Sequence, residues 1–370
     1  HRRGNQPTGG DAQRSDHRDV NGADQTASGG DAQLVPAMLE EYGNLTRVAL
    51  CEYLQPREPR RHLYNLVADY PRRAGRMLRP SLLIATARSF GASLEDAVGT
   101  AAALELLHNA FLVHDDIEDE SEERRGRPTL HALHGVAAAI NVGDALTLLG
   151  LRALIDNRQR LGPRLAMQVM EEAERMARET VEGQAIELGW RRDNALHISD
   201  ADYLDMVLKK TCWYTTIFPI RAGVLIGTRS NRDLDRFLRF GFFLGAAFQI
   251  QDDLLNLQGD PQRYGKELSG DLWEGKRTLM LIHLLRSTAE DERDRLFRFL
   301  SMPRRARTPE DVNWVGGLMK QYGSLEHARQ VAHGLAGAAR HEQQILYAQM
   351  PASRDLCFVE GILRWVLLRT

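Results

Sequence analysis

Two acidic clusters inside apolar, helix-like segments constrain this chain more than any other feature. The first is Asp115-Asp116-Ile117-Glu118-Asp119 in the segment LELLHNAFLVHDDIED, and the second is Asp252-Asp253-Leu254-Leu255-Asn256 in FFLGAAFQIQDDLLNL. Carboxylates are normally kept out of apolar helix faces because burying an unpaired charge costs free energy. Each cluster therefore needs a compensating charge. A site built from carboxylates alone most often holds Mg²⁺ together with a phosphate.

The composition of the 370-residue chain narrows the class of protein. Hydrophobic residues make up 43% of the chain, which is enough for a large core. The chain contains no uninterrupted run of 18 apolar residues, so we expect no transmembrane helix. A formal net charge of −2, from 48 basic and 50 acidic residues, argues against a general nucleic-acid-binding protein. The three widely spaced cysteines predict no disulfide framework and favour a cytoplasmic protein.

The first 33 residues differ in composition from the rest of the chain. They are rich in Gly, Asp, Arg and Gln and nearly free of large apolar residues, which predicts a disordered N-terminal tail (1–33) without the apolar stretch of a secretory signal. From residue 34 onward no composition shift marks an internal boundary. We therefore expect one domain over 34–370.

The apolar spacing in that domain is helical almost throughout. Segments such as AMQVMEEAERMARETVEGQAIEL carry apolar residues at i, i+3, i+4 and i+7, and no segment alternates in the manner of a strand. The segment GFFLGAAFQI is apolar nearly all round, which is typical of a helix in the middle of a bundle. The pattern predicts an all-α fold, a large antiparallel bundle with a central apolar cavity.

The spacing within the clusters suggests how the acids act together. Asp115 and Asp119 are one helical turn apart and share a face, and Asp116 lies about 100° further round. Acids this close raise one another's pKa unless cations are present, and Mg²⁺ bound to a diphosphate would supply the compensation. The alternative for one such cluster in isolation is a solvated acidic cap on the surface.

Basic residues follow or separate the clusters at positions suited to a diphosphate. Arg suits bidentate contact with a phosphate, and Lys suits contact as a point charge. They are Arg124 and Arg125 after the first cluster, Lys210 with Thr211 between the clusters, and Lys266 and Lys276 after the second.

At this point the chain resembles a known family, the trans-type isoprenyl diphosphate synthases or polyprenyl synthetases, over about residues 70–290. The first motif reads ELLHNAFLVHDDIEDESEERRGRPTLH, and the second reads FQIQDDLLN followed by GDLWEGKRT. Supporting fragments are NVGD, EGQAIEL and KT. The pair of motifs with these surroundings is highly specific, and it implies the isoprenoid synthase type of helical bundle.

The resemblance also implies a role for each matching position. By this resemblance, three Mg²⁺ ions are expected in each active site. Five aspartates would hold them: Asp115, Asp116, Asp119, Asp252 and Asp253. Contacts to the allylic diphosphate are implied for Arg124, Lys210, Thr211, Gln249, Lys266 and Lys276. Binding of isopentenyl diphosphate is implied for Gly75, Arg76, Arg79, His108 and Arg125. Lys210 is expected to act in catalysis with the aspartates, and the active molecule is expected to be a homodimer.

The implied reaction is ionisation of the allylic diphosphate, attack by the isopentenyl double bond and loss of a proton. It requires electrostatic stabilisation where charge develops and a dry apolar pocket around the cation. The chain departs from the family pattern in two places. Arg76 stands where the family usually has Lys, and Asn256 stands where the second motif usually ends in Asp.

Residues one turn before Asp115 are expected to form the floor under the growing product. They are Ala110 and Phe111, and one small residue beside one aromatic suggests a C20 product, with C15 as the alternative. Ordinary core packing is the competing interpretation of Phe111.

Two other functions stay open on the sequence alone. A terpene cyclase on the same scaffold would tolerate Arg76 in place of the usual Lys, because it does not need to bind isopentenyl diphosphate. The presence of Arg79, His108 and Arg125, which the resemblance assigns to that substrate, argues against a cyclase. A regulatory subunit of a heteromeric synthase would be expected to lose aspartates, whereas both clusters are present.

Overall fold

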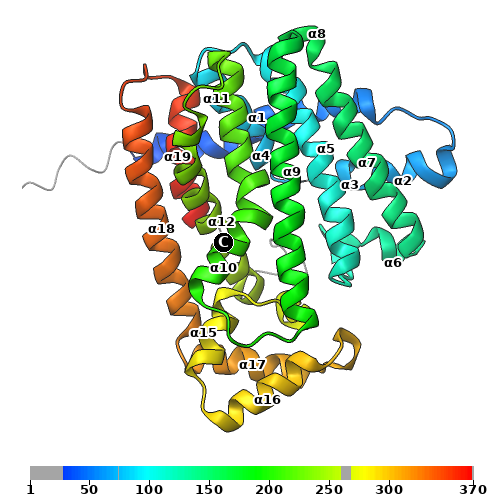
Figure 1. Cartoon of the computed structure of the whole chain (residues 1–370), viewed down its shortest axis with the longest axis vertical. Helices are drawn as coiled ribbons and strands as arrows, with labels where there is room; N and C mark the ends of the chain where they lie inside the picture. The colour runs from blue at the N-terminus through cyan, green and yellow to red at the C-terminus, as the bar shows by residue number, and fades with distance from the viewer. Residues whose placement is uncertain (1–27, 74, 260–267, 369–370) are drawn as a thin grey trace, which may run out of the picture.

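The computed structural model describes residues 28–73, 75–259 and 268–368, and almost all of them are helical (Figure 1). The N-terminal half comprises α1 (Ser28–Tyr53), η1 (Arg60–Tyr64), α2 (Asn65–Val67), α3 (Asp69–Arg72), α4 (Leu78–Ser89), α5 (Leu94–Glu118), β1 (Glu123–Arg124), β2 (Arg127–Pro128), α6 (Leu130–His134), α7 (Val136–Asp156), α8 (Arg158–Leu161) and α9 (Pro163–Arg192). The C-terminal half comprises α10 (Asp200–Val207), η2 (Leu208–Ile217), α11 (Phe218–Thr228), η3 (Leu234–Phe237), α12 (Leu238–Gln258), α14 (Gly270–Glu274), α15 (Leu279–Ser287), α16 (Glu290–Ser301), η4 (Arg304–Ala306), α17 (Pro309–Gln321), α18 (Ser324–Tyr347) and α19 (Arg354–Leu367).

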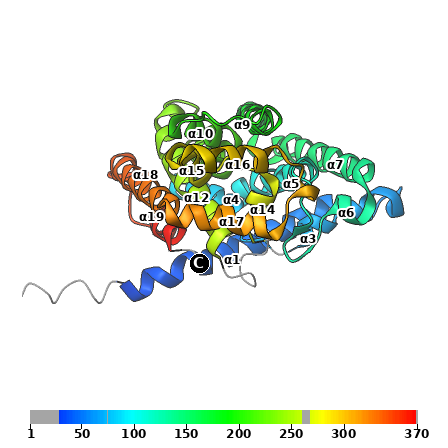
Figure 2. The ribbon, with the colours of Figure 1, turned by 90° about the horizontal axis from the view of Figure 1, so that it is seen from below.

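The long helices form a bundle around two buried ones. Seen from below, α4 and α12 lie in the interior, with α5, α7, α9, α18 and α19 around them (Figure 2). Every residue of α4 from Pro80 to Ala87 is buried, and α12 buries Leu244, Ala246 and Ile250. The all-α prediction and the interior position of the GFFLGAAFQI segment are thus confirmed.

Side-chain caps fix where several helices begin. Ser93 accepts a hydrogen bond from the backbone N–H of Asp96 at the start of α5, and Ser199 forms a reciprocal capping box with Asp202 at the start of α10. These caps set the register of two helices that carry site residues. The first acidic cluster lies at the opposite, C-terminal end of α5, where backbone carbonyls add negative potential, and the second lies in the C-terminal half of α12.

The structure differs from the sequence predictions at two points. Helix α1 begins at Ser28, inside the segment predicted to be disordered, while residues 1–27 lie outside the described part of the chain. The loop after the first cluster forms a short antiparallel hairpin of β1 and β2, with Glu123 opposite Pro128. Among the described residues, one stretch, Val136–Leu161, is long and apolar enough to cross a membrane by length and composition alone. In its most apolar part, 44% of the residues are buried inside the bundle.

Candidate active site

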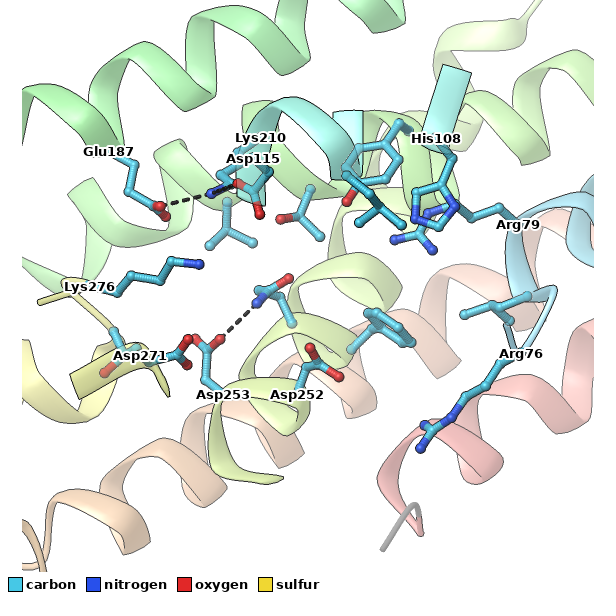
Figure 3. A pocket seen from close by; sticks show the side chains of 18 of the residues that line it. Arg76, Arg79, His108, Asp115, Glu187, Lys210, Asp252, Asp253, Asp271 and Lys276 are labelled. Atoms are coloured by element: carbon cyan, nitrogen blue, oxygen red, sulfur yellow. Dashed lines mark hydrogen bonds and ion pairs between the residues drawn. The ribbon is translucent and has the colours of Figure 1, made fainter. Parts of the chain in front are cut away.

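The main cavity, of about 570 Å³, opens between the ends of α5 and α12. In Figure 3, Asp115 and Lys210 lie on one side of the cavity, and Asp252 and Asp253 lie on the other. Lys276 is at one end of this view, and His108 with Arg79 is at the other end. Apolar side chains complete the lining, among them Leu112, Met206, Val207, Tyr214 and Phe248. The two clusters predicted from the sequence therefore meet across one partly apolar space.

Asp116 is the most enclosed acid of the first cluster. Its carboxylate is fully buried and accepts hydrogen bonds from Arg124 Nε at 3.1 Å and from the hydroxyl of Tyr70 at 2.6 Å. Arg124 Nη2 makes a further short contact with the same carboxylate. Asp116 does not line the main cavity among the described residues. It links α5 to the β hairpin and to α3, and its predicted metal contact remains a prediction.

Asp115 and Asp119 are paired with cations from other parts of the chain. Lys210 Nζ lies 3.2 Å from Asp115, while Arg191 Nη2 and Lys276 Nζ lie 2.7 and 2.6 Å from the two oxygens of Asp119. Burial and the charge of Asp115 nevertheless raise the pKa of Asp119 to about 6, against the opposing effect of Lys276. Asp119 therefore remains under-compensated even with two cations beside it.

In the second cluster, Asp253 is hydrogen-bonded by neutral groups. Asp253 accepts hydrogen bonds from the hydroxyl of Tyr203 and from Gln249 Nε2, both at 2.7 Å. Burial raises the pKa of Asp253 to about 7, and neighbouring Asp252 adds to the shift although both hydrogen bonds oppose it. Asp252 and Gln249 both line the cavity, as the resemblance implied.

Asn256, the departure from the second motif, has a structural role. Its side-chain oxygen accepts a hydrogen bond from the backbone N–H of Asp271 at 3.1 Å, and its backbone carbonyl accepts one from Ser269 at 2.8 Å. These bonds anchor the first turn of α14 to α12. The carboxylate of Asp271 lines the cavity beside Asp253, so an acid from α14 stands near the motif that ends in Asn.

The two lysines reach the cavity from different directions. Lys210 lies in the π-helical segment η2, where it contacts Glu187 of α9 at 2.8 Å, and Thr211 lines the cavity beside it. A Cβ on Gly183 would lie 2.2 Å from the backbone nitrogen of Lys210, so a glycine is required for α9 and η2 to pack this closely. Lys276 follows α14 and contacts Glu274 at 3.1 Å. Burial lowers the pKa of Lys210, but Asp115 and Glu187 outweigh it and the pKa is raised. Lys210 is therefore charged near neutral pH.

The groups expected to bind isopentenyl diphosphate gather at the other end of the cavity. Arg79 donates to Thr215 Oγ1 at 2.9 Å and stacks on the ring of Tyr214, while Arg125 donates to the backbone carbonyl of Arg73 at 2.9 Å. A Cβ on Gly75 would lie 2.9 Å from Arg125 Nη2. In Figure 3 the guanidinium group of Arg76 lies well apart from the guanidinium group of Arg79 and from the ring of His108. All five predicted residues line the cavity.

Neither residue predicted to set the chain length lines the cavity in the described part of the chain. Ala110 is buried, and on an α-helix it lies about 200° round from His108, so it faces away from the cavity. Phe111 instead packs edge-on against Tyr214, with ring centroids 5.6 Å apart, and Tyr214 does line the cavity. Phe111 therefore supports the cavity wall from behind.

The donor chemistry of the two clusters fits a hard divalent cation. Among the described residues, no three acidic, imidazole or thiol groups already converge on one point. Protein cations lie between the acids instead, with Lys210 at Asp115 and Lys276 at Asp119. The acids of both clusters offer carboxylate oxygens, and burial raises the pKa values of Asp119 and Asp253. Residues with these properties suit the binding of Mg²⁺.

Several site residues were not predicted from the sequence. They are Tyr70, Glu105, Glu187, Arg191, Tyr203, Asp271 and Glu274. Glu187 lies in the quoted fragment EGQAIEL, and Asp271 and Glu274 lie in GDLWEGKRT, so family motifs could have indicated them. The two tyrosines lie in no quoted motif. Lys266 lies outside the described residues.

The chain matches the family model described as Polyprenyl synthetase over residues 60–318. The chain therefore belongs to the polyprenyl synthetase family of all-α prenyltransferases, which confirms the fold class and the family expected from the sequence.

Relatives and solved structures agree with this assignment. A short chain isoprenyl diphosphate synthase of Methanothermobacter thermautotrophicus is 32% identical over 272 residues, covering 74% of this chain and 81% of the relative. The geranylgeranyl pyrophosphate synthetase of Pyrococcus horikoshii superposes with a TM-score of 0.79 at 28% identity, covering 92% and 99% of the two chains. A polyprenyl synthase of Caulobacter crescentus, solved with calcium and isoprenyl diphosphate, gives a TM-score of 0.78 at 26% identity and covers 92% and 97%.

Proposed function

We propose that this chain is a Mg²⁺-dependent trans-prenyltransferase that condenses isopentenyl diphosphate with an allylic diphosphate into a short-chain prenyl diphosphate. The observation that supports this most strongly is the cavity itself. Acids of the two clusters line one end together with Lys210 and Lys276, and Arg79, Arg125 and His108 line the other, with apolar side chains also in the lining. Two anionic substrates can therefore bind with their hydrocarbon parts facing each other.

The allylic diphosphate would bind between the acidic clusters. Asp115, Asp119, Asp252 and Asp253 would hold Mg²⁺, and the family resemblance gives three ions as the expected number. When bound, Mg²⁺ would neutralise charge on the diphosphate and make it a better leaving group. Lys210 and Lys276 contribute fixed positive charge at the same place, where negative charge accumulates as the carbon–oxygen bond breaks.

The apolar wall would protect the allylic cation formed on the substrate. Leu112, Tyr214 and Phe248 line the cavity, and their apolar surface would keep water away from the cation. The double bond of isopentenyl diphosphate, held by its own diphosphate at Arg79 and Arg125, would attack that carbon. Loss of a proton from the new cation, to the released diphosphate, completes the condensation.

We propose a C20 product, with the pair of Phe111 and Tyr214 as the floor. The support is the edge-on contact of these rings at the cavity wall. Removing Phe111 would let Tyr214 move back, so Phe111→Ala is expected to give longer products by chromatography of the dephosphorylated alcohols. An unchanged product length would show that Phe111 only packs in the core. Ala110→Val, on the opposite side of α5, is the matched control and should leave the length unchanged.

The activity is tested by incubating the purified chain with Mg²⁺, isopentenyl diphosphate and the C5, C10 or C15 allylic diphosphate. Elongated diphosphates support the proposal. A cyclic hydrocarbon formed from the allylic diphosphate alone would point to a terpene cyclase. No product from the chain by itself, together with product after adding a partner subunit, would point to a regulatory subunit.

We also propose a homodimer in the cytoplasm. The support for a dimer is an apolar strip on α7, where Val136, Ile140, Leu148 and Leu151 are all exposed. Leu148→Asp is expected to give monomers in sedimentation equilibrium, whereas Ile345→Asp on α18, a similarly exposed position, should not. The three free cysteines, Cys51, Cys212 and Cys357, are compatible with a reducing compartment.

A further inference from the structure

The end of the cavity that is rich in arginine contains one buried carboxylate without an assigned role. Glu105 on α5 is 4% exposed and lines the cavity one turn before His108. Its Oε2 lies 3.6 Å from His108 Nδ1, just beyond hydrogen-bonding distance. Asn109 holds this turn of α5, because its side-chain nitrogen donates to the backbone carbonyl of Glu105 at 2.7 Å. A carboxylate is unexpected at this place, because the neighbouring Arg79, Arg125 and His108 are expected to bind an anionic substrate.

Four elements present charged or titratable groups to His108. They are Glu105 on α5, Arg79 on α4, Arg125 in the turn between β1 and β2, and Tyr214 on η2, whose ring centroid lies 5.7 Å from that of His108. Burial and the charge of Arg79 lower the pKa of His108 to about 4, and Glu105 opposes the shift. Without substrate, His108 is therefore neutral near pH 7.

A neutral imidazole is poorly suited to hold a diphosphate. If its Nδ1–H points to Glu105, the other ring nitrogen is an acceptor, and it would meet the acceptor oxygens of the ligand. An imidazolium would donate from both nitrogens, one to Glu105 and one to the diphosphate. Arrival of the anion also offsets the charges of Arg79 and Arg125, which are among the groups that disfavour the imidazolium.

We propose that Glu105 is a positioning residue that lets His108 take up a proton when isopentenyl diphosphate binds. The proton comes from solvent and adds to the second ring nitrogen, so the bound state contains carboxylate, imidazolium and diphosphate in a row. Glu105 thus supplies negative charge on one side of the imidazolium while the substrate supplies it on the other. This inference rests on the proposed function, because it assumes that this end of the cavity binds isopentenyl diphosphate.

The linkage fixes the direction of the pH effect. His108 has a low pKa when free and a raised pKa when the ligand is bound, so protons bind along with the ligand between those two values. Affinity for isopentenyl diphosphate should therefore fall as the pH rises through the pKa of the bound state. The diphosphate of the ligand also takes up and releases protons. The variant His108→Gln, which has no imidazole at this position, measures that contribution of the ligand separately.

The test is calorimetric titration of the full chain with isopentenyl diphosphate at pH 7 in two buffers of different ionisation heat, which counts protons taken up. We expect the wild type to take up more protons than His108→Gln, by up to about one per ligand. Glu105→Gln should lose most of that difference and bind about tenfold more weakly, the effect of one unit in the pKa of His108. Affinity for the allylic diphosphate should be unchanged in both variants.

Equal proton uptake by the wild type and His108→Gln would overturn the proposal, as would wild-type uptake by Glu105→Gln. Thermal unfolding shows whether Glu105→Gln folds, and if it does not, Glu105→Asp keeps the charge and should retain proton uptake. Failure of the wild type to bind isopentenyl diphosphate at any pH would instead refute the proposed function.

Discussion

The acids at the end of α5 and those on α12 lie around one cavity, which Asp115, Asp252 and Asp253 line, but their partners differ. Asp116 and Asp119 are paired with Arg124, Arg191 and Lys276. Asp253 is held by Tyr203 and Gln249, which carry no charge. In the first cluster the partners of these two acids are cations, whereas the hydrogen-bond donors to Asp253 are neutral. We infer that the acids of α5 belong to a more fixed ionic frame and that Asp253 on α12 responds most strongly to metal and pH.

The largest expected effect contrasts Asp116 with Asp252. Asp116→Asn should lower the free energy of unfolding by about 3–5 kcal/mol, because it leaves the buried guanidinium of Arg124 without its partner. Asp252→Asn should change it by less than about 1 kcal/mol, since Asp252 is only partly buried at the cavity. Urea unfolding of both variants measures the difference. Equal losses would contradict the distinction between the two clusters.

A second effect should have the opposite sign. The pKa of Asp253 is raised to about 7, so this residue weakens the metal-free protein progressively as the pH rises from about 4 to about 7. Asp253→Asn should therefore stabilise the chain in the presence of a chelator at pH 8, by about 1–3 kcal/mol, and the gain should vanish near pH 4. Denaturant unfolding at the two pH values measures this. A destabilised variant at pH 8 would show that Asp253 is fully compensated by its two neutral partners.

Two adjacent lysines, Lys209 and Lys210, provide a matched test of whether an acidic partner positions Lys210 in the cavity. Lys210 contacts Glu187 inside the cavity, and Lys209 contacts Glu179 on the outside at 2.9 Å. Glu187→Gln should reduce kcat about tenfold, because Lys210 loses one of the two acids that hold it at the leaving group. Glu179→Gln is the control and should leave kcat unchanged. Similar kcat values for both variants would mean that Glu187 does not position Lys210.

The smallest effect concerns Asn256. Asn256→Asp keeps the oxygen that accepts from Asp271, so kcat/KM should change less than about threefold. Asn256→Ala removes the anchor of α14 and should reduce kcat/KM about fivefold, the cost of about one hydrogen bond. Steady-state kinetics of the two variants tests whether Asn256 is an anchor. A larger loss in the Asp variant would point to a role for its missing charge.

Local pattern predicted much of this molecule, and long-range pairing explains most of what it missed. Apolar context placed the clusters on buried helices, their basic neighbours indicated Lys210 and Lys276, and the family resemblance indicated Gln249; all three residues line one cavity. The partners of the acids, such as Tyr70 and Tyr203, come from other helices, and nothing in their own neighbourhood indicates which helix they will face. Of the residues expected to bind isopentenyl diphosphate, Arg125 also stood out as a basic residue after the first cluster, whereas Gly75, Arg76, Arg79 and His108 were found through the family resemblance alone.

The prediction for Ala110 and Phe111 shows a different kind of limit. Counting back one turn from Asp115 selected a stretch of α5 next to the cavity, but it ignored the direction of each side chain. Helical geometry places Leu112 on the cavity side with His108 and Asp115, and it places Ala110 on the far side. The direction of Phe111, toward Tyr214, depends on how η2 packs against α5 and could not be obtained from spacing.

The central claim is that both clusters act on one diphosphate through a shared divalent cation site. Calorimetric titration of inorganic pyrophosphate into the full chain, with and without Mg²⁺, tests it most directly with the wild type, Asp115→Asn and Asp252→Asn. We predict binding that requires Mg²⁺ and is weakened at least about tenfold by either substitution. Binding of equal strength without Mg²⁺, or a loss in only one of the two variants, would contradict a single site built from both clusters.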